Sequence, residues 1–304
     1  MIQTGTERMT PAIRECIRKC YTMEDPRYFE FFFRYLYRPE WFFVDNEQNT
    51  AAALVCRIPH DVMFNGRIIR MSMLSYACTS QEFRNQGRIR RIIETALDAC
   101  THSELITLVP GEYSEAYRPF GFEPIYYRTE YRISRENARR ISNIGCAYEP
   151  NPLDMLKVYS AFIRRFNGFF ARDLEYFVNL KREINARGGK IVAYYNEKDQ
   201  IQGYASILIG AKEATIEECI YLDSMTINKL VNAALQERAT VNLRVSEAEN
   251  LSRLFPESRK RTFPSVLARL NDASLFSRLF STEVKDVKEA FAITQNPLYL
   301  SERI

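Results

Sequence analysis

The stretch that decides the fold reads MSMLSYAC at residues 71–78, TSQEF at 79–83 and RNQGRI at 84–89. The first run predicts a buried β-strand, the second interrupts it, and the third sets a glycine directly before an amphipathic helix. A helix leaves its first four N–H groups unpaired and carries a partial positive charge at that end. A strand, a glycine turn and a helix in this order therefore predict a pyrophosphate site, and Gly87 stands where a Cβ would crowd an approaching phosphate.

The residues after Gly87 predict an amphipathic helix and then a second strand. Apolar side chains recur at helical spacing, at Ile89, Ile92, Ile93, Ala96 and Leu97. Charged residues fall on the opposite face, at Arg88, Arg90, Arg91, Glu94 and Asp98. An apolar run at residues 105–109 predicts the next strand, so a right-handed crossover is expected to join two parallel strands.

Three short motifs in this region resemble the Gcn5-related N-acetyltransferase (GNAT) superfamily. Arg84-x-x-Gly87-x-Ile89 resembles the superfamily's Arg/Gln-x-x-Gly-x-Gly/Ala turn, with an isoleucine in place of the small residue. The Eis-like branch (enhanced intracellular survival) commonly carries a larger apolar residue there. In that branch a Thr-x-Pro-Glu-Tyr-Arg segment leads into the turn. Residues 79–84 are similar to it, with a glutamine in place of the proline. Residues 117–122 are similar to the Tyr-x-x-x-Gly-Phe element that follows the next strand.

The resemblance implies acetyl-CoA as a cosubstrate, held between the splayed ends of the two parallel strands. Its pantetheine arm would bond main-chain groups at the end of the first strand, and its pyrophosphate would rest on N–H groups of the glycine turn. The implied cofactor-binding residues are Ala77, Cys78, Thr79, Arg84, Gln86, Gly87, Arg88 and Ile89. In this family the acceptor amine attacks the thioester directly, and the match implies Tyr117 as the general acid that protonates the leaving thiolate. A free thiol has a pKa of about 8.5 and a phenol of about 10, so this transfer is only slightly uphill.

The general base stays open at this point. The strand at residues 71–78 contains no Asp, Glu or His, so Glu112, Glu115 or an ordered water are the candidates. His60 and His102 are the only histidines, and we expect both to be surface or structural residues.

Composition limits the class of protein. A length of 304 residues predicts two domains. The net charge is +4, from 42 basic and 38 acidic residues, and this small excess argues against nucleic acid as a partner. A nucleic-acid protein would use Arg84, Arg88, Arg90 and Arg91 as a basic helix, but the even charge balance and the absence of a recognisable nucleic-acid module argue against that function. No apolar segment approaches the roughly 20 residues that span a bilayer, and the first residues lack the apolar core of a signal peptide. We expect a cytoplasmic protein without a membrane partner.

The seven cysteines are scattered, with no paired metal-ligand spacing. Cys16 and Cys20 lie one helical turn apart, which can hold a metal only with partners that the sequence does not reveal. We expect reduced, mostly buried thiols and no metal.

The domain organisation also resembles the Eis-like branch, in which an active GNAT domain precedes a degenerate one. The sequence predicts a catalytic domain at residues 1–145, a second GNAT-like domain at 150–270, and a C-terminal helix and tail at 271–304. In the second domain a strand and a helix recur, but the joining turn at residues 222–224 has no glycine and reads as an N-cap at Asp223 or Ser224. The expected fold is α/β (α+β), with tandem GNAT folds, each a mixed central sheet with a splayed parallel strand pair flanked by helices.

The C-terminal residues carry two further expectations. An apolar stripe at Leu275, Phe276, Leu279 and Phe280 is expected to dock on the second domain. In the relatives the chain terminus reaches toward the active site, whereas the short tail here leaves the role of the Ile304 carboxylate open. Because such relatives often assemble through the second domain, a homo-oligomer is possible.

Two functions follow from these observations. The leading hypothesis is an acetyl-CoA-dependent N-acetyltransferase that acts on a primary amine of a small molecule or peptide. The alternative is a catalytically silent GNAT-like protein that binds an acyl-CoA as a sensor or scaffold, because the first strand lacks a carboxylate. The sequence does not identify the acceptor amine.

Overall fold

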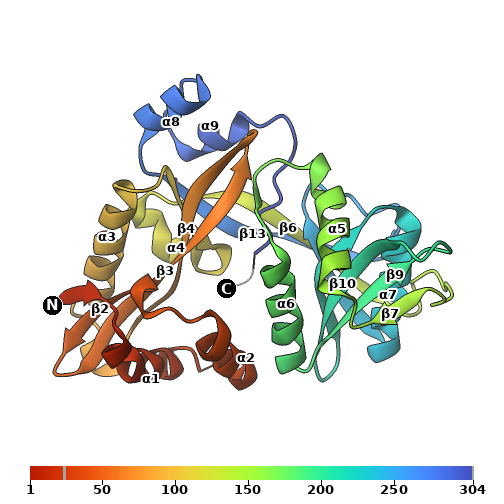
Figure 1. Ribbon diagram of the computed structural model, residues 1–304, viewed down its shortest axis with the longest axis horizontal. Coiled ribbons are helices and arrows are strands. Elements are labelled where there is room, and N and C mark those ends of the chain that lie inside the picture. Colours follow the sequence, from red (N-terminus) through yellow and green to blue (C-terminus); the bar gives the residue numbers. More distant parts are fainter. Residues whose placement is uncertain (23–24, 303–304) are drawn as a thin grey trace. The chain divides into compact units, whose positions relative to one another are not determined.

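The computed structural model describes residues 1–22 and 25–302, which form two units (Figure 1). The first unit consists of residues 1–126, 264–295 and 302, and the second of residues 127–263 and 296–301. These limits differ from those of the predicted domains. The first segment of the first unit ends at residue 126 rather than at 145, and this unit also includes most of the C-terminal segment. The Ile304 carboxylate lies outside the described residues.

The first unit is built on a mixed sheet in the order β1-β2-β3-β4-β5-β13. These strands are β1 (Ile2–Thr4), β2 (Phe42–Glu47), β3 (Thr50–Phe64), β4 (Arg67–Thr79), β5 (Ile106–Pro110) and β13 (Arg259–Leu270). All neighbouring strands run antiparallel except β4 and β5, which are parallel and joined by α3 (Arg88–Thr101). The predicted crossover and the mixed sheet with a parallel pair are therefore confirmed.

Helices cover both faces of this sheet. Alternate residues of a strand point to opposite faces, so β3 directs Leu54 and Cys56 toward α1 (Thr10–Cys20) and Ala53 and Val55 toward α3. The apolar stripe of α3 is buried at Ile92, Ile93, Ala96 and Leu97, as its spacing predicts. The remaining helices of this unit are α2 (Pro26–Phe31), α4 (Ser114–Tyr117), α8 (Ala273–Phe280) and α9 (Val287–Ala292).

The C-terminal helices of this unit pack on the long β3–β4 hairpin, drawn in orange in Figure 1. The ring of Phe64, at the end of β3, lies 6.1 Å from the ring of Phe276, 5.5 Å from that of Phe280 and 5.2 Å from that of Phe291. The prediction that the apolar stripe docks on the second domain is wrong. Because α8 follows β13 and β13 pairs with β5, the stripe is brought to the first unit instead.

The strands of the second unit follow the order β6-β12-β11-β10-β9-β7 and include parallel and antiparallel neighbours. Its strands are β6 (Glu123–Ser134), β7 (Cys146–Tyr148), β9 (Lys190–Tyr195), β10 (Ile201–Ile209), β11 (Ala214–Tyr221) and β12 (Thr240–Ser246), and the short β8 (Phe169–Phe170) also belongs to this unit. Its helices are α5 (Pro152–Phe162), α6 (Leu174–Ala186) and α7 (Ser224–Glu237). β11 and β12 are parallel and joined by α7, which repeats the arrangement of β4, α3 and β5. Asp223 is the N-cap of α7 and accepts a 2.7 Å hydrogen bond from the Thr226 N–H, as the sequence predicts.

Each sheet includes a strand from the other half of the sequence. β6 follows the first crossover along the chain but pairs with β12, whereas β13 follows the second crossover but pairs with β5. The first unit is therefore discontinuous in sequence, because β13 joins it only after the residues of the second unit, whereas the second unit is continuous from residue 127 to 263 and adds residues 296–301. Among the described residues, no helix has the length and apolarity needed to cross a membrane.

Candidate active site

A cavity of about 590 Å³ opens in the first unit where β4 leaves β5. The two strands pair only from Met71 to Met73, beside Ile106 to Leu108, and β4 then continues to Thr79. Eight of the nine predicted site residues line this cavity: Ala77, Cys78, Thr79, Arg84, Gly87, Arg88, Ile89 and Tyr117. The ninth, Gln86, is exposed beside the cavity, and its side-chain oxygen accepts a hydrogen bond from Arg88 Nε.

A β-bulge turns the end of β4 toward the cavity. Leu54 pairs with Cys78 and Cys56 with Ser75, so β4 has one residue more than β3 across this interval. Tyr76 within it has a φ of +50°, a left-handed conformation that costs free energy for a bulky residue. The rings of Tyr21 and Phe32, 5.4 and 4.9 Å away, pack on the Tyr76 ring and hold it in place. The sequence analysis missed this bulge because no glycine marks it.

The carbonyl groups at this strand end already have donors within the protein. The Ala77 oxygen accepts a hydrogen bond from the Tyr21 hydroxyl at 3.3 Å. The Thr79 oxygen accepts from Arg84 Nε at 3.3 Å and from the Cys20 thiol at 3.4 Å. Each carbonyl oxygen has two lone pairs, so the Ala77 oxygen retains one for an amide N–H of a ligand. Tyr21 and Cys20, at the end of α1, are site residues that the sequence analysis did not include.

The glycine turn has the geometry of an anion cradle. Gly87 is the N-cap of α3 with a φ of +69°, and its cap is not closed by a side chain. A Cβ built on Gly87 would meet no protein atom within 4 Å, so it would project into open space beside the cavity. The first N–H groups of α3 therefore face a space large enough for an anionic group.

Arg88 fixes this turn to the sheet. Its guanidinium donates a 2.9 Å hydrogen bond to Asp45 Oδ2, donates another to Glu47, and lies over the Phe83 ring. Burial by itself would raise the pKa of the Asp45 carboxyl, but the hydrogen bonds from Arg88 and the N-terminal ammonium outweigh it and lower the pKa. The Arg88 charge is thus balanced by two carboxylates of β2.

Tyr117 is part of the cavity wall. It is the last residue of α4, it is buried, and its ring packs edge-on against Phe122 at 5.5 Å. Glu112 and Glu115, the candidate bases, are exposed and do not line the cavity. His60 lies on β3, where burial lowers its pKa to about 4, and His102 is exposed near Asp98. Among the described residues, the lining contains no carboxylate and no imidazole.

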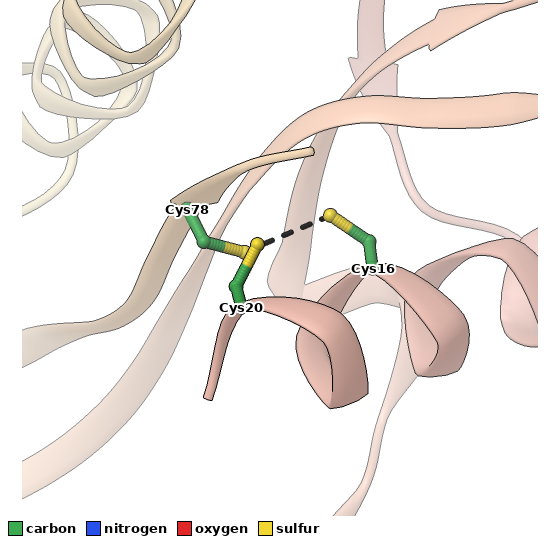
Figure 2. Close-up of side chains that lie close together, drawn as sticks. All are labelled: Cys16, Cys20 and Cys78. Carbon is green, nitrogen blue, oxygen red and sulfur yellow. Dashed lines mark hydrogen bonds between the residues drawn. The ribbon is translucent and has the colours of Figure 1, made fainter. Parts of the chain in front are cut away.

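Three cysteines converge at the edge of this cavity. The Sγ atoms of Cys16, Cys20 and Cys78 all lie within 4.8 Å of one another, and Figure 2 shows them pointing toward a common centre from α1 and from the end of β4. Hydrogen bonds from the Cys16 and Cys78 thiols lower the pKa of Cys20, although burial acts in the opposite direction. The spacing of Cys16 and Cys20 indicated such a pair, but nothing in the sequence linked it to Cys78.

Residues 1–125 match the family described as acetyltransferase (GNAT) domain, and every residue that lines the cavity falls within this range. Residues 1–125 are a GNAT domain. The curated proteins contain no match to the sequence. The predicted resemblance to the GNAT superfamily is thereby confirmed for residues 1–125, and this range contains every residue that lines the candidate site.

The similarity to solved structures extends beyond residues 1–125 and covers both units. A probable N-acyltransferase from Enterococcus faecalis is 17% identical with a TM-score of 0.74, over 89% of this chain and 72% of its own. A GCN5-related N-acetyltransferase from Anabaena variabilis is 15% identical with a TM-score of 0.71, over 90% of this chain and 73% of its own. Eis1 from Mycobacterium abscessus is 13% identical with a TM-score of 0.67, over 91% of this chain and 75% of its own. At these identities the likeness shows that the fold is shared and nothing about function.

Proposed function

We propose that this protein is an acetyl-CoA-dependent N-acetyltransferase that acetylates a primary amine of a small molecule or peptide. The observation that carries the proposal is that the end of β4, the glycine turn and Tyr117 line one and the same cavity. These three elements have the chemistry that an acyl thioester of a nucleotide requires: polar main-chain groups for an extended arm, N–H groups for a diphosphate, and an acid near the sulfur.

The residues present fit acetyl-CoA. The open space in front of Gly87 would accept the diphosphate, which the N–H groups of Gly87, Arg88 and Ile89 would bind together with the positive end of α3. The pantetheine arm would run along Ala77, Cys78 and Thr79. When bound, acetyl-CoA supplies an acetyl group activated as a thioester.

Tyr117 supplies the proton in this proposal. Its position in the cavity wall and its burial would exclude water from the phenol and would hold the hydroxyl in one direction. General acids of this kind contribute typically about 10²–10⁴-fold to a rate. Since no carboxylate or imidazole occurs in the described lining, the base that accepts the amine proton would be a water molecule, or the amine would enter already neutral.

The absence of a base from the described lining also favours a second function. A GNAT domain that binds an acyl-CoA without transferring its acyl group would need the cradle and the strand end but not a base. Such a protein would act as a sensor or scaffold, and its cavity would keep all the ligand-binding features described above.

One experiment distinguishes the two functions. Release of CoA thiol is measured with acetyl-CoA and a panel of aminoglycosides, polyamines and lysine peptides, and acetyl-CoA affinity is measured by isothermal titration calorimetry. Turnover with at least one amine supports the enzyme, whereas acetyl-CoA binding with no turnover across the panel supports the silent binder. No binding of acetyl-CoA at all would exclude both.

The role of Tyr117 has a separate test. We expect Tyr117→Phe to lower turnover by about a hundredfold while acetyl-CoA affinity stays nearly unchanged, because only the hydroxyl is removed. The matched control is Tyr148→Phe, on an exposed residue of the second unit, which should change neither quantity. Loss of acetyl-CoA binding in Tyr117→Phe would contradict the assigned role.

A further inference from the structure

Acetyl transfer would make no use of the cluster formed by Cys16, Cys20 and Cys78. Direct attack of an amine on a thioester requires no enzyme thiol, yet three of the seven cysteines meet in one place. Cys16 and Cys78 are buried, whereas Cys20 is partly exposed and lines the cavity together with Cys78. Figure 2 shows that the three side chains come from two adjacent turns of α1 and from the end of β4.

The distances between the sulfur atoms fit a tetrahedral metal ion. A Zn–S bond of about 2.3 Å places two thiolates of a tetrahedral site about 3.8 Å apart. The Sγ atoms of Cys16 and Cys78 are 3.7 Å apart, and the third sulfur lies within 4.8 Å of both. A disulfide would instead need a separation of about 2.05 Å and would leave one of the three thiols unused. The convergence of three sulfurs therefore favours a metal ion over a disulfide.

The surrounding charges are also suited to a thiolate-bound cation. Three thiolates around a divalent ion leave one net negative charge, which Arg84 can balance because its Nε and the Cys20 thiol both contact the Thr79 carbonyl oxygen.

We propose that Cys16, Cys20 and Cys78 form a binding site for a thiophilic metal ion such as Zn²⁺, with three thiolate ligands. Among the described residues, this group contains no fourth His, Cys, Asp or Glu ligand. Because Cys20 and Cys78 line the cavity, the fourth position faces the cavity and takes a water molecule or a small exogenous ligand. Three protein ligands with an exchangeable fourth position are typical of zinc sites that are not purely structural.

The experiment measures metal binding by the reduced full-length chain. Protein freed of metal with a chelator is titrated with Zn²⁺, and with Co²⁺ as a spectroscopic probe whose thiolate charge-transfer band reports sulfur ligation. We expect about one ion per chain, and at least about a hundredfold loss of Zn²⁺ affinity in Cys16→Ser, Cys20→Ser and Cys78→Ser, more than the 10–100-fold typical of an outer-shell change. The matched control, Cys146→Ser in the second unit, should bind as the wild type does.

Two further measurements use the wild-type chain and do not depend on how the variants fold. Zn²⁺ binding should release two or three protons per ion, because the ligands are thiolates. Addition of imidazole should shift the Co²⁺ spectrum, because it enters the open fourth position. The proposal is overturned by substoichiometric binding, by unchanged affinity in all three cluster variants, by binding without proton release, or by recovery of a Cys16–Cys78 disulfide in place of the metal. An unchanged Co²⁺ spectrum with imidazole would overturn the open position.

Discussion

Gly87→Glu tests the central claim that the turn before α3 holds the diphosphate of acetyl-CoA. A Cβ at Gly87 meets no protein atom within 4 Å, so the substitution fits the fold but sends a carboxylate into the cradle. At about 5 Å and an effective dielectric constant of about 20, two like unit charges repel by about 3 kcal/mol. Since 1.4 kcal/mol corresponds to a factor of ten, acetyl-CoA should bind at least about a hundredfold more weakly.

The control for this variant is Gly66→Glu. Gly66 also has a left-handed backbone, with a φ of +79°, and a Cβ there also meets nothing within 4 Å, but it lies in the β3–β4 turn and not in the cavity. Both variants should lose about 1–2 kcal/mol of stability from the left-handed conformation. Calorimetric titration with acetyl-CoA and thermal unfolding are measured for both. Full affinity in a folded Gly87→Glu, or an equal loss of affinity in Gly66→Glu, would refute the cradle.

Three further perturbations test the fold around the site. Phe64→Ala should lower the free energy of unfolding by about 3–5 kcal/mol, because this ring is fully buried among aromatic side chains of α8 and α9; a chemical denaturation curve with an unchanged midpoint would contradict that packing. The lowered pKa of Asp45 means that its pairing with Arg88 stabilises the protein above the unfolded pKa of about 3.9, and that this stability is lost as the pH falls through the lower folded value. As the pH falls from about 5 to about 3, the free energy of unfolding of Asp45→Asn should therefore decrease less than that of the wild type. Urea unfolding at several pH values measures both, and equal decreases would contradict the prediction. A fragment of residues 1–145, the predicted catalytic domain, should not fold, because it lacks β13; a cooperative thermal transition in its circular dichroism would show that β13 is dispensable.

Short-range features of the fold were predictable from the sequence. The apolar stripe of α3, the glycine turn at Gly87 and the parallel pair of β4 and β5 were all predicted, and each depends on residues fewer than 40 positions apart. The N-cap at Asp223 was predictable for the same reason, since a cap involves only the first turn of its own helix.

Long-range pairing was not predictable in the same way. Apolar periodicity tells which face of a helix or strand is buried but not which element covers it, so α8 was assigned to the wrong unit. The pairing of β6 with β12 and of β13 with β5 has no local signal in the sequence either. Strands far apart in the chain can pair at little extra cost, because the entropy of closing a loop grows only slowly with its length. The predicted domain limits at residues 145 and 150 therefore followed composition, whereas the units follow strand pairing.

The candidate site likewise combines features that the local sequence predicts with features that depend on tertiary structure. The sequence by itself determined the glycine turn, the residues at the end of β4 and the motif that contains Tyr117, because each is a local pattern of residue types. Only the tertiary structure decided that the bulge at Tyr76 turns β4 toward the cavity, and that Cys78 meets Cys16 from 62 positions away. The physical reason is that backbone conformation follows from near neighbours, whereas the convergence of side chains depends on how the sheet and its helices pack as a whole.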